Sequence, residues 1–308
     1  MLKTTTDFTQ DPNFILARRL NSQLLKHPLD PSVAVGLQHE IGKRILPEAH
    51  GRMVVPTAYG FPMIIELETS HTPSMQGSIE RNLYFLGTYE PGTLEVIRRS
   101  LETWGEGATF ADIGAHNGLM SIYAASVGAQ QVFSFEPNPG MFELMQANVA
   151  LNGCLNIKTF ALALGEKRQT VSMETDYQNS GAAHIVEAQT ASVRDVAMDT
   201  LDHLARQHDI GRINLLLMDV EGYEINVLNG AEKMIAAGKP DLIIEYDPSD
   251  QDRRVVAFLR KHGYQLYVLE HSRHIVGELV PFRKSTGATQ MDNLFCFQPD
   301  RAEKLGLA

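Results

Sequence analysis

The sequence predicts an α/β fold in which helices cover both faces of a mostly parallel sheet. From Gly107 onward, short apolar runs alternate with segments whose apolar residues recur at helical spacing. The runs 213–219 and 241–246 are mostly apolar, as is typical of strands buried on both faces of a sheet. Strands that alternate with helices in this way favour a parallel sheet with helical crossovers.

Seven strands and five helices are expected in this main part, which we place at 105–300. The strands are 108–113, 131–136, 157–162, 213–219, 241–246, 264–270 and 293–298. The helices are 118–127, 140–152, 201–208, 224–237 and 251–262. The stretch 169–196 is more polar and β-like, which predicts a hairpin inserted between a strand and a helix.

Two shorter stretches precede the main part. Residues 1–50 are expected to be an N-terminal helical extension, with one helix that Pro28 and Pro31 end and a second over 33–45. Residues 51–104 are expected to be a lead-in of one hairpin and one helix, which could cover a substrate or cofactor. The helices of the extension could pack on the chain's own core, lie on a membrane, or join two copies into a homodimer.

Composition excludes several classes of protein. The chain has 308 residues and a formal net charge of −10, so it repels phosphate backbones and nucleic acid is disfavoured as a partner. Two isolated cysteines, Cys154 and Cys296, do not form a disulfide framework or a zinc site. We see no signal peptide and no apolar run of about 18 residues, and therefore expect a cytoplasmic protein without a membrane span.

Acidic residues end four of the predicted strands. Asp112 ends the first strand and is followed by the turn Gly114-Ala115-His116-Asn117-Gly118; the other acidic residues are Glu136, Asp219 with Glu221, and Glu245 with Asp247. In open α/β sheets, ligands bind outside the carboxyl ends of the strands, where strand order reverses. These carboxylates are therefore expected to line one pocket.

The negative charge of Asp112 distinguishes between two candidate cofactors, a dinucleotide and S-adenosylmethionine. A dinucleotide site uses Gly-x-Gly-x-x-Gly, but Asp112 stands where the first glycine would be, and a carboxylate repels a pyrophosphate. The same carboxylate suits a ligand with an ammonium group, such as the methionine part of S-adenosylmethionine. Glu136, one helix and one strand later, can accept hydrogen bonds from ribose hydroxyls. The pattern therefore favours S-adenosylmethionine over NAD.

These residues belong to a series of motifs that resembles the FkbM-type methyltransferases, a branch of the class I S-adenosylmethionine-dependent enzymes. The motifs are Gly87-Thr88-Tyr89-Glu90, 110–115, 135–139, 148–152, 163–165, 200–202, Asp219-Val220-Glu221-Gly222-Tyr223-Glu224, 227–231, Pro240 and Glu245. The resemblance implies a Rossmann-like class I methyltransferase fold with a seven-stranded sheet. It also implies O-methylation of a hydroxyl on a sugar or natural-product-like small molecule.

The resemblance also assigns a cofactor site. It comprises Glu90, Asp112, Gly114, Ala115, His116, Asn117, Gly118, Glu136, Pro137, Ala163, Leu164 and Asp219. In this assignment Glu136 binds the ribose hydroxyls, Ala163 and Leu164 flank the adenine, and Asp219 faces the reactive methyl. His116 departs from the family's loop, which has asparagine there. Either Asn117 takes over its hydrogen bonds, or His116 meets the cofactor carboxylate.

Methylation of a hydroxyl needs a base, and we expect this base among Asp219, Glu221 and Glu245. His116 and His184 are the next candidates. The same carboxylates could instead hold a hard cation that orients a diol, although no metal is expected. Two other functions stay open: N-methylation of a peptide or amine, and a silent scaffold that only binds the cofactor. For Glu224, a structural role at the start of a helix is the better interpretation.

Overall fold

The computed structural model describes residues 5–24, 31–67, 79–174, 184–185, 193–246, 250–270, 276–282 and 292–307. The chain divides into two compact units, which we call the first and the second unit. The first unit is Met1–Glu90 with Ala150–Gly153, and the second is Pro91–Val149 with Cys154–Ala308. None of the helices in the described ranges is both long and apolar enough to cross a membrane.

The first unit contains three strands and three helices. They are β1 (Thr6–Asp7), α1 (Pro12–Leu24), α2 (Pro31–Ile45), β2 (Gly51–Pro56), β3 (Pro62–Leu67) and α3 (Ile79–Phe85). The two expected helices and the hairpin β2–β3 are confirmed. Helix α3 was not predicted from the sequence. Arg18 of α1 donates hydrogen bonds to the carbonyl oxygens of Leu83, Tyr84 and Phe85 at 2.7–2.8 Å, which ties α1 to the end of α3.

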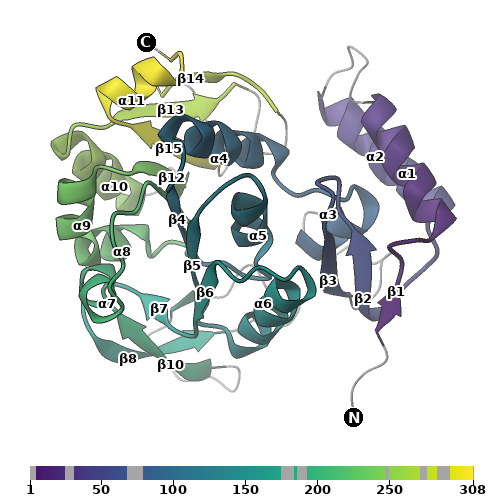
Figure 1. The fold of residues 1–308 in the computed structure, drawn as a ribbon, viewed down its shortest axis with the longest axis horizontal. Helices are drawn as coiled ribbons and strands as arrows, with labels where there is room; N and C mark the ends of the chain where they lie inside the picture. Colours follow the sequence, from purple (N-terminus) through teal and green to yellow (C-terminus); the bar gives the residue numbers. More distant parts are fainter. Residues whose placement is uncertain are drawn as a thin grey trace. The chain divides into compact units, whose positions relative to one another are not determined.

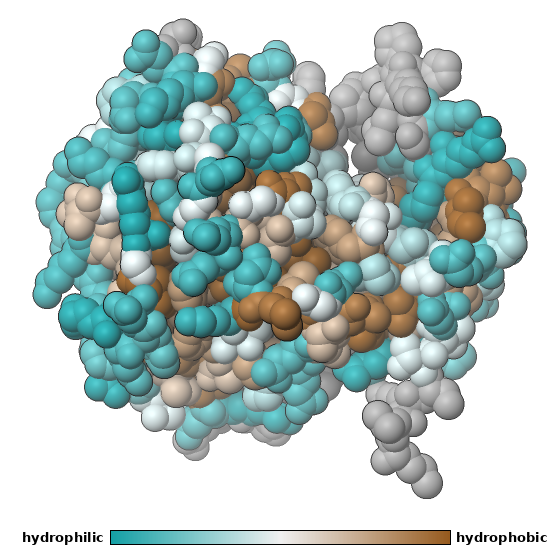
Figure 2. Space-filling view, viewed as in Figure 1, coloured by the Kyte–Doolittle hydropathy of each residue, from teal (hydrophilic) through white to brown (hydrophobic). Residues whose placement is uncertain are grey.

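Apolar side chains remain accessible on the N-terminal helices. Hydrophilic side chains cover most of the face drawn in Figure 2, and a hydrophobic patch lies over α1, where Ile15 is 52% and Leu16 46% exposed. Val33 and Leu37 of α2 are 50% and 41% exposed. A homodimer through these helices stays a prediction.

The second unit is built on one large sheet with the order β14-β13-β15-β12-β11-β4-β5-β6. Its strands are β4 (Thr109–Ile113), β5 (Gln131–Phe135), β6 (Ile157–Phe160), β11 (Leu215–Met218), β12 (Asp241–Tyr246), β13 (Gln265–Leu269), β14 (Leu279–Pro281) and β15 (Asp292–Phe297). The five strands from β6 to β12 are parallel, and β15 is antiparallel to both of its neighbours. The predicted α/β class is confirmed.

The count of seven strands needs a correction, because the sheet has eight. All seven predicted strands are present, and β14 adds an antiparallel edge strand beside β13. With three residues, β14 is too short to show a period in the sequence. A second, four-stranded sheet has the order β7-β10-β8-β9, made from β7 (Ala163–Leu164), β8 (Gln169–Glu174), β9 (His184–Ile185) and β10 (Val193–Asp199). Its antiparallel pair β8–β10 is the expected hairpin insertion.

Helices lie on both sides of the large sheet (Figure 1). They are α4 (Pro91–Trp104), α5 (Leu119–Ser126), α6 (Pro139–Leu151), α7 (Leu201–Gln207), α8 (Glu224–Gly230), α9 (Glu232–Gly238), α10 (Asp250–Lys261) and α11 (Pro299–Lys304). One buried cluster joins strand residues such as Ala111, Ile113 and Met218 to α7, α8, α9 and α10. Because side chains alternate along a strand, Asp112 points to the other face, where α5 packs on β4.

The single predicted helix over 224–237 is two helices, and this prediction was wrong. Helix α8 ends at Gly230, and Ala231 leaves helical geometry with a φ of −114° and a ψ of 3°. A Cβ at Gly230 would overlap the carbonyl oxygen of Gly165. The glycine therefore lets α8 approach the backbone that follows β7, and the chain turns there into α9.

A buried ionic cluster stabilises the amino edge of the sheet. Asp241, the first residue of β12, is fully buried and pairs with Arg301 at 2.7 Å. Ser100 and the indole of Trp104 also donate hydrogen bonds to Asp241, at 2.6 and 2.9 Å. The guanidinium of Arg301 lies 4.0 Å from the Trp104 ring. The charge of Asp241 is thus compensated within the protein.

Strand order reverses between β4 and β11. From β4 the chain adds β5 and β6 on one side, and it later adds β11 and β12 on the other. A crevice opens at such a reversal, beyond the carboxyl ends of the strands. The candidate site is expected at this point.

Candidate functional site

The turn after β4 is fixed to the end of β11. Gly114 has a φ of +83°, and a Cβ there would overlap the carbonyl oxygen of Asp219. The amide of Asp219 also donates to the Ile113 carbonyl at 3.0 Å. At Gly114 the protein's own backbone therefore fills the space that a side chain would take.

The middle of the turn accommodates the unusual residue His116. Its φ is +50°, a left-handed conformation that asparagine, aspartate and histidine adopt more readily than other side chains. Histidine therefore fits the backbone at this position. Asn117 accepts from the Leu119 amide through Oδ1 at 3.2 Å, and its carbonyl accepts from Asn148 at 2.9 Å. Gly118, with a φ of +84°, precedes the first residue of α5.

Glu136 locks this turn from the end of β5. Its Oε2 accepts from the His116 amide at 2.8 Å, and its Oε1 accepts from the Asn138 amide at 2.7 Å. Burial raises the pKa of the Glu136 carboxyl, and the nearby His116 opposes that shift. A carboxylate has about four acceptor positions. Two therefore remain for hydroxyl groups of a ligand.

Asp112 is a buried carboxylate without a cation beside it among the described residues. It is 1% exposed, and its Oδ2 accepts a 2.5 Å hydrogen bond from the Ser121 hydroxyl. The hydroxyl oxygen of Ser134 lies 2.7 Å from the hydroxyl oxygen of Ser121. Burial raises the pKa of Asp112 to about 7; the Ser121 hydrogen bond lowers it, and the Glu136 charge raises it further.

Sequence reasoning missed both serines. The signal for Ser134 is one polar residue in the otherwise apolar run 132–135, opposite Asp112 in the ladder. Ser121 lies three residues after Gly118, and its position against β4 becomes evident only once α5 is packed on the sheet.

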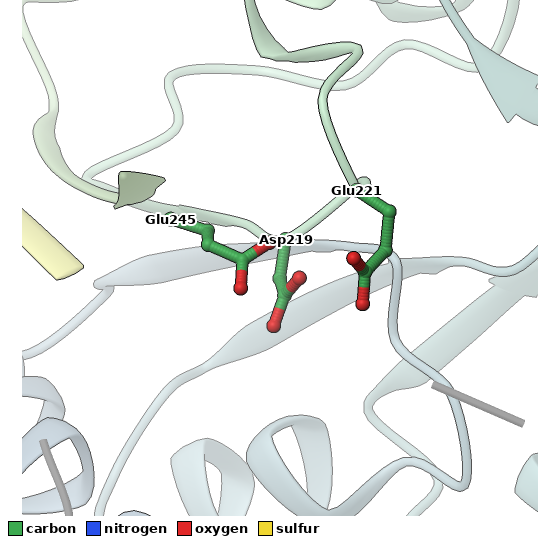
Figure 3. A group of neighbouring side chains, drawn as sticks. All are labelled: Asp219, Glu221 and Glu245. Atoms are coloured by element: carbon green, nitrogen blue, oxygen red, sulfur yellow. The ribbon is translucent and has the colours of Figure 1, made fainter. Parts of the chain in front are cut away.

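Three predicted acidic residues gather at the carboxyl ends of β11 and β12. Carboxylate oxygens of Asp219, Glu221 and Glu245 all lie within 4.8 Å of one another. Figure 3 shows the three carboxylates side by side, Glu245 from the strand β12 and the others from the loop after β11. Oxygen-only ligands of this kind suit a hard cation as well as a proton. The structure thus brings together the residues that we expected to include the base.

The loop that carries Asp219 and Glu221 is held by Glu224. Glu221 has a φ of +53° and Gly222 one of +90°. Oε1 of Glu224 accepts from the amides of Val220 and Gly222, at 3.3 and 3.1 Å. Glu224 therefore bridges the strained residue Glu221, which agrees with the structural role expected for it.

The remaining predicted site residues are spread over the chain. Ala163 and Leu164 form β7 and are buried, and Pro137 directly follows Glu136. Glu90 is a buried residue with a φ of +45° at the end of the first unit. His184 begins β9, but its side chain lies outside the described part, as does Asp247.

Strand order, the glycine turn and the acidic strand ends together define a Rossmann-like α/β protein of the class I methyltransferase type. Residues 112–266 match the family model described as the methyltransferase FkbM domain. That is half of the chain, and the chain therefore belongs to the FkbM methyltransferase family. Use of S-adenosylmethionine in general follows from this membership.

Similar proteins carry related names. Methyltransferase sdnD of Sordaria araneosa is 24% identical over an alignment of 188 positions, and the match covers 50% of this chain and 73% of that protein. Hexuronic acid methyltransferase AglP of Haloferax volcanii is 26% identical over 139 residues, which are 45% of this chain and 56% of that protein. The crystal structure of methyltransferase FkbM from Methylobacillus flagellatus is 16% identical, with a TM-score of 0.44, and the match covers 73% of this chain and 57% of that one.

Proposed function

We propose that this chain binds S-adenosylmethionine over the turn 112–118 and methylates a hydroxyl of a sugar or natural-product-like small molecule. The observation that carries the proposal is the cluster of Asp219, Glu221 and Glu245, whose carboxylates lie within 4.8 Å of one another. The backbone contact between Gly114 and Asp219 joins this cluster to the turn. A cofactor site and a proton acceptor are thus adjacent.

Buried polar atoms with no partner support the cofactor's place. Oδ1 of Asp112 and Nδ2 of Asn117 are buried and have no hydrogen-bond partner among the described residues. An unmade buried hydrogen bond costs about 1–3 kcal/mol, so such atoms indicate a missing ligand. An ammonium group would satisfy Asp112, and a carboxylate would satisfy Asn117. The methionine part of S-adenosylmethionine carries both.

The chain's own residues divide the work. Bound there, S-adenosylmethionine supplies a methyl group activated for in-line displacement. In the proposed arrangement Asp112 binds the ammonium, and Glu136 uses its remaining acceptor positions for the ribose hydroxyls. Ala163 and Leu164 are the proposed adenine neighbours. One of the three clustered carboxylates takes the proton from the acceptor hydroxyl, which is typically worth about 10²–10⁴-fold in rate.

A hydroxyl acceptor fits this cluster better than an amine. A neutral amine attacks without prior loss of a proton, whereas a hydroxyl needs a base. The name of AglP describes a methyltransferase acting on a hexuronic acid, which supports a sugar-like acceptor by analogy. N-methylation of a peptide or amine is the alternative, and a silent scaffold would keep the cofactor site but show no turnover.

Calorimetry with S-adenosylmethionine, S-adenosylhomocysteine and NAD tests the cofactor, and we expect binding of the first two only. A panel of sugars, uronic acids and amines, followed by release of S-adenosylhomocysteine, tests the acceptor. Asp219→Asn, Glu221→Gln and Glu245→Gln are compared with Glu303→Gln, an exposed residue of α11. Full turnover in all three site variants contradicts the base. Loss of activity with a chelator, restored by Mg²⁺, would assign the cluster to a cation instead.

A further inference from the structure

Asp112 accepts a hydrogen bond from the buried Ser121 hydroxyl, which in turn contacts a second buried hydroxyl, Ser134, and the proposed chemistry uses neither serine. Asp112 is the cross-strand partner of Ser134 on β5, and Ser121 reaches it from α5. Both serines are fully buried. Polar side chains at such positions need a reason, because apolar ones would pack there without the cost of desolvation.

We propose that Ser134 and Ser121 form a two-hydroxyl relay that positions Asp112 for the ammonium group of S-adenosylmethionine and favours the ionised form of this carboxylate. The proposal rests on the cofactor site proposed above. Ser121 and Ser134 are positioning residues, since they act on the ligand only through Asp112.

Counting protons fixes the direction of the relay. An ionised carboxylate has no proton to give, so the Ser121 hydroxyl donates to Oδ2 of Asp112, at 2.5 Å. A serine has one hydroxyl proton. The 2.7 Å contact between the two serines therefore has Ser134 as donor and Ser121 as acceptor. Both hydroxyl dipoles point toward Asp112, and hydrogen bonds in such a chain strengthen one another.

The relay leaves one carboxylate oxygen available. Oδ2 is occupied by Ser121, whereas Oδ1 has no partner among the residues described. The relay thus fixes the rotation of the carboxylate and leaves Oδ1 for the ligand. It also opposes the effect of burial, because a hydrogen bond to the charged form favours that form.

Among the residues that the structure describes, no ion pair supplies Asp112 with a positive charge that could favour its ionised form instead. The ionisable groups around it are Glu136 beyond β5, His116 in the turn and Asp219 beyond β11, while β11 places Leu217 opposite Asp112. Glu136 raises the pKa of Asp112, and His116 acts on Glu136. In the described part of the chain, Asp112 therefore depends on hydroxyl groups for its charge until a cationic ligand arrives.

A second buried serine–aspartate pair offers a matched control. Ser100 donates to Asp241 at 2.6 Å, and both residues are fully buried. Asp241 lies at the amino end of its strand, whereas Asp112 lies near the carboxyl end of β4. Asp241 differs because Arg301 already neutralises it. Ser100→Ala therefore removes the same kind of hydrogen bond without touching the cofactor site.

The test is the pH dependence of S-adenosylhomocysteine binding, by calorimetry from about pH 6 to about pH 8.5. S-adenosylhomocysteine carries the same amino-acid end and is not consumed. In the wild type, the Kd should rise as the pH falls through about 7, because protonated Asp112 no longer attracts an ammonium. Ser121→Ala should move this midpoint upward by about one pH unit and weaken binding about tenfold at neutral pH. The difference should shrink toward pH 8.5.

Ser134→Ala should move the midpoint in the same direction by a smaller amount, and it keeps the test usable if Ser121→Ala does not fold. Ser100→Ala should lower thermal stability and leave the binding profile unchanged. Proton release on binding, from titrations in two buffers of different ionisation enthalpy, should increase in Ser121→Ala near pH 7. A midpoint that stays in place in both relay variants, or moves equally in Ser100→Ala, overturns the relay alone. A wild type that binds no S-adenosylhomocysteine overturns the cofactor site and the relay together.

Discussion

Replacing Asp112 by asparagine should stabilise the ligand-free chain at high pH. Asparagine keeps the shape and an acceptor oxygen for Ser121, but it has no charge to bury. The wild-type carboxyl has a folded-state pKa of about 7, raised mainly by burial, against about 4 for an unfolded chain. The folded protein therefore binds more protons than the unfolded one between these two values.

The sign and size of the change in unfolding free energy follow from this difference in bound protons. The contribution of Asp112 to stability is fully present below about pH 4 and is lost as the pH rises through about 7. A shift of about three pH units corresponds to about 4 kcal/mol. The free energy of unfolding of Asp112→Asn, relative to the wild type, should therefore rise by about 4 kcal/mol from pH 4 to pH 8. Any constant effect of the new amide cancels in this comparison.

Urea unfolding at several pH values, without cofactor, measures the difference directly. The same substitution at the other buried aspartate, Asp241→Asn, is the control. It should destabilise the chain by about 3–5 kcal/mol at neutral pH, because it leaves the buried charge of Arg301 unpaired. A difference between Asp112→Asn and the wild type that is independent of pH, or that falls as pH rises, would refute the reasoning. The variant should also lose affinity for S-adenosylmethionine.

Three further outcomes are expected. Gly114→Ala should cost at least about 2 kcal/mol in urea unfolding, since the new Cβ meets the Asp219 carbonyl at a positive φ; Gly128→Ala, with open space around it, should cost less. Arg301→Met should destabilise by about 3–5 kcal/mol in thermal unfolding while the Kd for S-adenosylhomocysteine stays the same, and a changed Kd would contradict a purely structural role. Glu224→Gln retains an acceptor for the Val220 and Gly222 amides and should keep most of kcat. Glu224→Ala removes this acceptor and should lower kcat about tenfold or more. Equal losses of kcat in the two variants would show that the charge of Glu224 matters instead.

Sequence periodicity was sufficient for most of the fold. All strands of the large sheet except β14 follow from apolar runs, because strands buried on both faces consist mainly of apolar residues. The break between α8 and α9 did not follow, since it depends on Gly230 meeting the backbone of Gly165, 65 positions earlier in the chain. Strand β14 was missed because three residues are too few to show a period. Helix α3 was missed because six of its seven residues are buried, polar ones such as Glu80 and Arg81 included, so it has no alternation of apolar and polar faces.

The site shows the same division. The acidic cluster was predictable, because the carboxyl ends of neighbouring parallel strands meet at one edge of the sheet. The contact of Ser121 with Asp112, and of Ser134 with Ser121, was not predictable from the sequence. It depends on which face of α5 packs against β4. His116 was ambiguous in sequence, and its φ of +50° supplies a backbone reason for the exchange with asparagine.

The contact between Gly114 and Asp219 has a mechanical consequence. With no side chain between them and an amide-to-carbonyl bond of 3.0 Å beside them, the turn and the end of β11 behave as one stiff part. The backbone of the proposed cofactor turn and the backbone of Asp219 are then held together without any intervening side chain. Side chains that line the rest of the pocket can change with the acceptor without altering this alignment. A scaffold of this kind separates the adjustment of specificity from the precision of the reaction geometry.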